Sequence, residues 1–160
     1  MILGYDFDGV LAEGPPPNVK KWGLMNGAER NARKVSVLEH YRNAKQLFKP
    51  SGQFHVITAR KGEPEIIQVS KQWLIDKLPG QVLGVHFLKG SRTVENAGIF
   101  KYSVIKEQNI THFYEDNIKV LKVIRKYKKK DSHPVELFFV EWDANWTMKV
   151  TPLEEVPRRR

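Results

Sequence analysis

The chain has 160 residues, of which 41% are hydrophobic and 28% are charged, a composition that suits one folded domain and excludes a disordered chain. It has no cysteine, which excludes disulfides, thiolate nucleophiles and cysteine-bound zinc, and no apolar run near the roughly 20 residues that span a bilayer. We therefore expect a cytoplasmic protein with no membrane partner, whose net charge of +9 attracts phosphate-rich partners.

The first predicted strand, Ile2–Phe7, leads into a pair of acids. Asp6 and Asp8 are two positions apart, so in extended chain they point to the same side and repel each other unless a positive group lies nearby. A divalent cation or a phosphate-handling site would supply that compensation, whereas a simple turn cap is the alternative interpretation. Gly9 then allows the backbone to turn sharply away from the strand.

The next segment, residues 12–33, shows no regular pattern. Its run Gly14-Pro15-Pro16-Pro17 is a stiff, extended spacer. The segment is too long for a simple connection between a strand and a helix. We expect either a small flap over the carboxyl end of the first strand or a plain surface excursion.

Strand and helix patterns alternate along the rest of the chain. Further strands are expected at Phe54–Thr58, Val82–Leu88, His112–Glu115 and Val135–Glu141. Helices are expected at Lys34–Phe48, Pro64–Leu78, Ile99–Gln108 and Asn117–Lys129, the last with Asn117 as its N-cap. This alternation predicts an α/β fold: a Rossmann-like three-layer sandwich with a central, mostly parallel five-stranded sheet. Residues 1–160 are expected to form a single domain, with residues 142–160 as a C-terminal extension.

Much of the positive charge lies in one stretch without acids. It comprises Lys119, Lys122, Arg125, Lys126, Lys128, Lys129 and Lys130, and Arg158–Arg160 end the sequence. Such a run is typical either of a surface that binds nucleic acid or of the last turn of a helix, where the helix dipole favours Lys and Arg.

Polar residues follow the carboxyl ends of the predicted strands, where ligands bind in open α/β sheets. The second strand ends at Thr58, and Lys101 lies near the start of the helix before the fourth strand. We therefore expect one site from side chains scattered in the sequence: Asp6, Asp8, Thr58, Lys101, Glu115, Asp116 and Asn117, with Arg60 beside them.

This set of residues resembles the haloacid dehalogenase-like (HAD) superfamily of phosphatases, from Asp6 to about Glu141. Asp6-Phe7-Asp8-Gly9-Val10 matches the first motif of the family and Thr58 the second. Lys101 matches the motif lysine, with Lys106 as the alternative.

The acidic fourth motif differs from the family pattern. It is often a pair of aspartates, whereas here it is Glu115-Asp116-Asn117. Asp116 is the expected metal ligand, supported by Glu115, and Asn117 would be a neutral ligand if the register shifted by one position.

The resemblance implies a Mg²⁺-dependent phosphoric monoester hydrolase that works through an aspartyl-phosphate. Asp6 would be the nucleophile, and Asp8 would act first as general acid and then as general base. Thr58 would donate a hydrogen bond to the phosphoryl group, and Lys101 would offset its charge. The implied metal ligands are Asp6, the backbone carbonyl of Asp8, and Asp116. Arg60 would either reach the substrate or form a surface salt bridge.

The sequence does not identify the substrate. The gaps between the motifs have no room for a large cap, so the resemblance allows a large phosphorylated substrate such as a nucleic-acid end, as well as a nucleotide. The alternatives are a small-molecule phosphatase closed by the flap, and a non-catalytic nucleic-acid-binding or assembly subunit. Trp142 and Trp146 would either stack a base or close the edge of the core.

Overall fold

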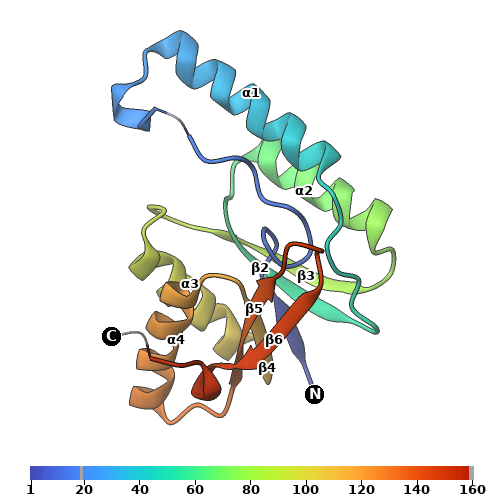
Figure 1. Cartoon of the computed structure of the whole chain (residues 1–160), viewed down its shortest axis with the longest axis vertical. Coiled ribbons are helices and arrows are strands. Elements are labelled where there is room, and N and C mark those ends of the chain that lie inside the picture. The colour runs from blue at the N-terminus through green and yellow to red at the C-terminus, as the bar shows by residue number, and fades with distance from the viewer. Residues whose placement is uncertain (19, 159–160) are drawn as a thin grey trace.

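In the computed structural model, which describes residues 1–18 and 20–158, one six-stranded sheet has the order β3-β2-β1-β4-β5-β6 (Figure 1). Five strands are parallel: β1 (Leu3–Tyr5), β2 (Phe54–Lys61), β3 (Val82–Leu88), β4 (His112–Glu115) and β5 (Glu136–Trp142). The last strand, β6 (Met148–Pro152), pairs antiparallel with β5. The predicted α/β, Rossmann-like fold class is confirmed.

The strand β6 was not predicted, because it falls inside the expected C-terminal extension. Its sequence is short and half polar, and it pairs with a single neighbour at the sheet edge. Such a strand becomes recognisable only when β5 lies beside it, since a lone edge strand carries little hydrophobic signal.

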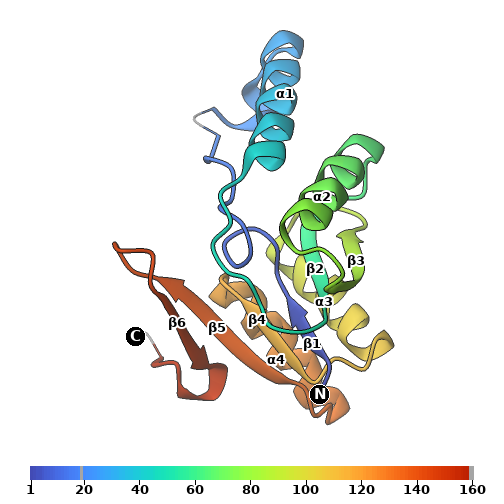
Figure 2. The ribbon, with the colours of Figure 1, turned by 90° about the vertical axis from the view of Figure 1, so that its right-hand side faces the viewer.

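Helices lie on both faces of the sheet (Figure 2). On one face, α2 (Pro64–Lys77) covers the sheet, and α1 (Gly27–Asn43) packs against α2 and extends beyond it. The other face is covered by α3 (Val94–Glu107) and α4 (Ile118–Asp131). Successive side chains of β2 point to opposite faces of the sheet and contribute to the hydrophobic core on each face. Val56 faces the α2 side and Ile57 faces the α3 side. No helix of the described chain is both long and apolar enough to cross a membrane.

The helix α1 begins earlier than the sequence pattern indicates, which corrects the irregular range predicted for residues 12–33. Asn26 and Glu29 form a capping box: Asn26 Oδ1 accepts from Glu29 N at 2.8 Å, and Glu29 Oε1 accepts from Asn26 N at 3.1 Å. The first half of the helix is largely exposed and therefore lacks apolar spacing. Among the described residues the irregular part is 12–18 and 20–26, interrupted by the short turn η1 (Trp22–Leu24).

Other boundaries shift by a few residues. The helix α3 starts at Val94 and not at Ile99, because Thr93 Oγ1 caps it by accepting from Asn96 N at 3.1 Å. A second short turn, η2 (Leu153–Glu155), follows β6. Val19, inside the predicted flap, and Arg159 and Arg160, in the predicted extension, lie outside the described residues.

The chain turns back on itself directly after β1. Gly9 has a φ of +82°, and its N–H donates to the carbonyl of Ala12 at 2.8 Å, which confirms the sharp turn predicted there. The chain then runs beside the segment that follows α1, where Leu47 N donates to Leu11 O at 2.8 Å and Glu13 N to Lys45 O at 2.9 Å. This pairing holds the turn against the body of the protein.

Candidate metal and phosphate site

The carboxyl ends of β1 and β4 bring three acids together. These strands are adjacent and parallel, and Asp6 N continues their pairing by donating to Tyr114 O at 2.9 Å. Asp6 therefore lies beside the two acids that end β4, and one oxygen each of Asp6, Glu115 and Asp116 lie within 4.8 Å of one another. This is the convergence that the strand ends predict.

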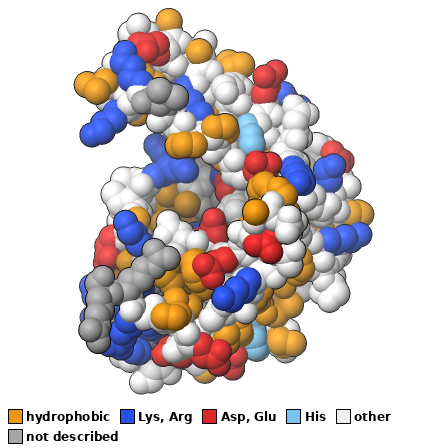
Figure 3. Space-filling view, viewed as in Figure 1, with side chains coloured by type: hydrophobic (Ala, Val, Ile, Leu, Met, Phe, Trp, Pro, Cys, Tyr) orange, Lys and Arg blue, Asp and Glu red, His pale blue; other side chains and the backbone are white. Residues whose placement is uncertain are grey.

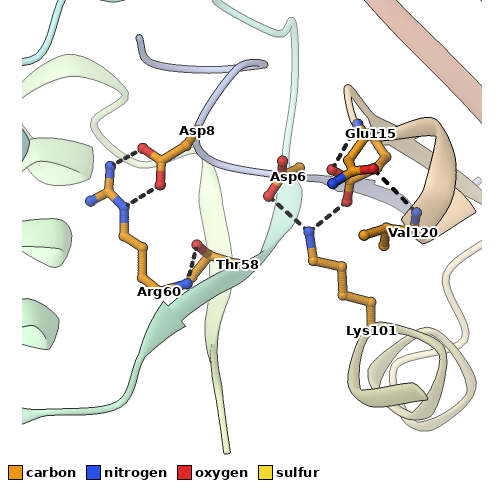
Figure 4. Close-up of polar contacts among 8 residues, drawn as sticks. Asp6, Asp8, Thr58, Arg60, Lys101, Glu115 and Val120 are labelled. Atoms are coloured by element: carbon orange, nitrogen blue, oxygen red, sulfur yellow. Dashed lines mark hydrogen bonds and ion pairs between the residues drawn. The ribbon is translucent and has the colours of Figure 1, made fainter. Parts of the chain in front are cut away.

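Lys101 extends toward this group from α3, on the face of the sheet that α3 and α4 cover (Figure 4). Its Nζ donates to Asp6 Oδ1 at 2.9 Å and to Glu115 Oε2 at 2.5 Å, and the lysine is only 2% exposed. Lys106, the alternative, is exposed and pairs with Asp131 at 3.3 Å. Only Lys101 contacts the acidic group.

The three acids compete for one buried ammonium. Burial opposes the ionisation of Asp6, but the charge of Lys101 and hydrogen bonds from its neighbours hold the pKa of Asp6 below its usual value. Burial and the charge of Asp6 raise the pKa of Glu115 well above its usual value. Loss of solvent and the charge of Asp6 raise the pKa of Asp116 to about 7. The charge of Lys101 thus favours ionisation of Asp6, whereas the charge of Asp6 opposes ionisation of the two neighbouring acids.

Gly9 makes room for Asp116. A Cβ added at Gly9 would lie 1.9 Å from Asp116 Oδ2, far inside van der Waals contact. Glycine is thus needed here for its backbone angle and for the close approach of the carboxylate. Three converging carboxylates around such an opening form an oxygen-only donor set, which fits a hard cation such as Mg²⁺.

Asp8 points away from the acidic group and pairs with Arg60 (Figure 4). Arg60 Nε donates to Asp8 Oδ2 at 2.9 Å and Nη2 to Asp8 Oδ1 at 2.6 Å, while Nη1 donates to Ser70 Oγ at 2.8 Å. The Cζ of Arg60 lies 3.7 Å from the ring centroids of both Phe7 and Tyr41. The expected salt bridge exists, but its expected place on the surface is wrong, because Arg60 is 1% exposed.

The sequence alone indicates one part of the surroundings of Arg60. Thr58 and Arg60 are two positions apart on β2 and so share one side of the strand. Ser70 and Tyr41, which complete the surroundings of Arg60, lie on α2 and α1 and have no local pattern that links them to β2. Only packing brings them together.

Thr58 and Asn117 are both engaged with backbone groups. Thr58 is 1% exposed, and its Oγ1 accepts from Arg60 N at 3.0 Å, which leaves the hydroxyl hydrogen without an acceptor among the described residues. Asn117 Oδ1 accepts from Lys119 N at 3.0 Å and from Val120 N at 3.4 Å. The predicted N-cap is confirmed, and this oxygen is thereby directed to the helix and not to the acidic group.

The basic stretch lies along α4. Lys128, Lys129 and Lys130 occupy its last turn, the position that the helix dipole favours. The helix begins beside Asp116 at the carboxyl end of β4 and runs back toward the opposite end of the sheet, where the next strand starts. The densest part of the basic run is therefore remote from the acidic group.

The two tryptophans that follow β5 differ in environment. Trp142 packs against the core cluster on the α2 side, and its Nε1 donates to the carbonyl of Gly9 at 2.7 Å. Core closure is thus the correct interpretation for Trp142. Trp146 is 47% exposed, so this interpretation does not extend to it.

Asp116 is the exposed member of the acidic group, whereas Asp6 and Glu115 are buried. Figure 3 shows a hollow between the lobe that carries α1 and the rest of the molecule. A separate cavity of about 720 Å³ lies beside β3, lined by residues that include His86, Lys89 and Glu107, and it contains none of the three acids. The acidic group therefore lies at the carboxyl ends of β1 and β4, with Asp116 exposed, and not in that cavity.

In comparisons with known proteins, no family model, no curated protein and no solved structure matches the chain. The site is therefore interpreted from its own chemistry.

Proposed function

We propose that the protein is a Mg²⁺-dependent phosphatase of the HAD-like type, which hydrolyses phosphomonoesters through an aspartyl-phosphate on Asp6. The observation that carries this proposal is the contact of Lys101 with Asp6 and Glu115, with Asp116 in the same group. It supports an ionised Asp6, which is the form a nucleophile needs, beside a set of oxygens suited to Mg²⁺.

Asp6 and Asp116 would hold the metal, and Lys101 holds Glu115 nearby. Bound Mg²⁺ would neutralise charge on the phosphoryl oxygens, which is the main requirement of phosphoryl transfer. Lys101 would neutralise further charge, and the free hydroxyl hydrogen of Thr58 would donate to the same group.

The reaction would proceed in two steps. A carboxylate oxygen of Asp6 attacks phosphorus, the bond from phosphorus to the leaving oxygen breaks, and Asp8 gives that oxygen a proton. A water then attacks phosphorus, gives its proton to Asp8, and the bond to Asp6 breaks. The pairing of both Asp8 oxygens with Arg60 suits the carboxylate that acts as base in the second step, and for the first step Asp8 would turn away from Arg60 carrying a proton.

The short connections between the site residues support a large substrate. Between Thr58 and Lys101 the chain forms only α2, β3 and the start of α3, so no inserted domain covers the site from that side. A nucleic-acid end or a nucleotide would have access. The alternative of a non-catalytic nucleic-acid-binding or assembly subunit gives no reason to bury Lys101 and Arg60 among acids, since burying such charges is costly.

The experiment is a phosphate-release screen with Mg²⁺. The panel contains phosphorylated oligonucleotides, mononucleotides, sugar phosphates and phosphopeptides. Asp6→Asn should abolish release, as should chelation of the metal. Asp76→Asn, which changes an exposed aspartate on α2, is the matched control and should retain activity. Absence of release from the whole panel would refute the proposal.

A further inference from the structure

Trp146 presents an exposed ring on a rigid turn. Its φ of +57° lies in the left-handed region, which bulky residues rarely adopt. Asp143 fixes the turn: its Oδ1 accepts from Asn145 N at 2.8 Å and from Thr147 N at 2.9 Å, and its carbonyl accepts from Trp146 N at 3.0 Å. The ring is therefore 47% exposed on a turn whose backbone is held by hydrogen bonds.

The turn is connected to the proposed site through Trp142. The ring centroids of Trp142 and Trp146 are 6.5 Å apart, and Trp142 holds the carbonyl of Gly9, the residue against which Asp116 lies. Because β4 and β5 are parallel, the hairpin after β5 starts at the same edge of the sheet as Asp116 (Figure 2). Trp146 therefore lies at the same edge of the sheet as the acidic group, in the turn beyond the end of β5.

A cation accompanies the ring. Lys45 Nζ lies 4.7 Å from the centroid of Trp146, and the residue is exposed. Its backbone is held beside the chain that leaves the Asp6–Gly9 turn, through the bond from Glu13 N to Lys45 O. An exposed aromatic ring with an exposed ammonium over it supplies the two groups by which proteins bind single strands, a ring for base stacking and a cation for phosphate pairing.

We propose that Trp146 and Lys45 bind the single-stranded end of a phosphorylated nucleic acid. A base takes the place of the Lys45 ammonium over the Trp146 ring, Lys45 turns to pair with a backbone phosphate, and the terminal phosphomonoester enters the site of Asp6. This inference rests on the proposed phosphatase function and specifies its substrate class. A sugar phosphate offers no planar ring for stacking, and a mononucleotide has no phosphodiester for Lys45.

Binding is measured apart from turnover, in the Asp6→Asn background, with fluorescently labelled oligothymidylate and oligouridylate that carry a terminal phosphate. Trp146→Ala should weaken binding about 5- to 150-fold, which corresponds to the loss of one stacked base at about 1–3 kcal/mol. Trp146→Phe should keep most of the affinity. Lys45→Gln should lower the slope of log affinity against log salt by about one.

The matched control is Trp22→Ala. Trp22 is also exposed, at 42%, and also lies under a cation, with Arg30 Cζ 5.4 Å from its centroid. It belongs to η1, far along the chain from the β5–β6 hairpin and at the outer end of the α1 lobe (Figure 1). This variant should bind the oligonucleotides as the parent protein does.

Turnover separates this inference from the proposed function. In the catalytic background, Trp146→Ala should lower kcat/KM for the oligonucleotide, mainly through KM, and leave hydrolysis of glycerol phosphate unchanged. Unchanged oligonucleotide binding by Trp146→Ala overturns the inference while the phosphatase stands. If no substrate is hydrolysed, the proposed function fails, and the binding measurement alone still decides the role of Trp146. A preference for thymidylate or uridylate identifies DNA or RNA as the source.

Discussion

Arg60 donates hydrogen bonds to both carboxylate oxygens of Asp8, from Nε at 2.9 Å and from Nη2 at 2.6 Å. The guanidinium is buried against the rings of Phe7 and Tyr41, so its orientation is fixed by packing as well as by charge. The two acids of the Asp6-Phe7-Asp8 segment therefore have separate partners, Lys101 for Asp6 and Arg60 for Asp8. Their mutual repulsion is relieved by two different cations.

Arg60→Met should lower the free energy of unfolding by about 3 kcal/mol, at the lower end of the range for breaking a buried ion pair, because the Asp8 side chain is 24% exposed. Urea denaturation measures this change. Lys20→Met removes an exposed pair with Glu29 and should change stability by less than about 0.5 kcal/mol. Equal changes in the free energy of unfolding would show that the buried Arg60–Asp8 pair stabilises the protein no more than an exposed pair does.

Lys101→Met should destabilise the protein by about 3–5 kcal/mol, because it leaves Asp6 and Glu115 buried beside each other without a cation. Lys106→Met, on the same helix, removes only an exposed pair with Asp131 and should stay within about 0.5 kcal/mol. Thermal and urea unfolding of both variants tests this difference. A larger loss in the Lys106 variant would contradict the assignment of Lys101.

Gly9→Ala should abolish stabilisation by Mg²⁺, because the new Cβ would occupy the position of Asp116 Oδ2. Gly80→Ala is the matched control: Gly80 has a similar φ of +74°, but a Cβ there would meet nothing within 4 Å. It should cost only the backbone strain of about 1–2 kcal/mol and leave the Mg²⁺ response intact. The measurement is the shift of Tm on addition of Mg²⁺, and an unchanged shift in Gly9→Ala would count against the site.

The stabilising effect of Mg²⁺ should grow as the pH rises through about 7. The folded-state pKa of Asp116 is about 7, above its ordinary 3.8, and that of Glu115 is also raised. These groups therefore stabilise the metal-free fold most at low pH, and that stability is lost as the pH rises through the folded pKa. Mg²⁺ binding needs the ionised acids and is favoured in the same direction.

The test compares Tm between about pH 5 and about pH 8, with chelator and with Mg²⁺. In chelator, the contribution of Asp116 should make Tm fall with rising pH, and Asp116→Asn should flatten this dependence. The gap between the two conditions should widen as the pH rises. A gap of constant size would mean that Asp116 does not exchange a proton for the cation.

The sequence by itself determined the fold class and the acidic centre. Alternating strands and helices require a parallel sheet with helices on both faces, and parallel strands place their carboxyl ends at one edge. Asp6 and Asp116 follow the ends of two such strands, so local pattern places both at one edge of the sheet, and the adjacency of β1 and β4 brings them together. The cap at Asn117 was equally local, since a cap bonds only to the next few residues.

Tertiary structure decided what depends on contacts between distant segments. The choice of Lys101 over Lys106 depends on which face of α3 turns toward β1, and the burial of Arg60 depends on Tyr41 and Ser70 from two separate helices. The different environments of Trp142 and Trp146 depend on a hairpin completed by β6. Local sequence specifies backbone conformation and periodicity, whereas burial and partner choice arise only when segments far apart in the chain pack together.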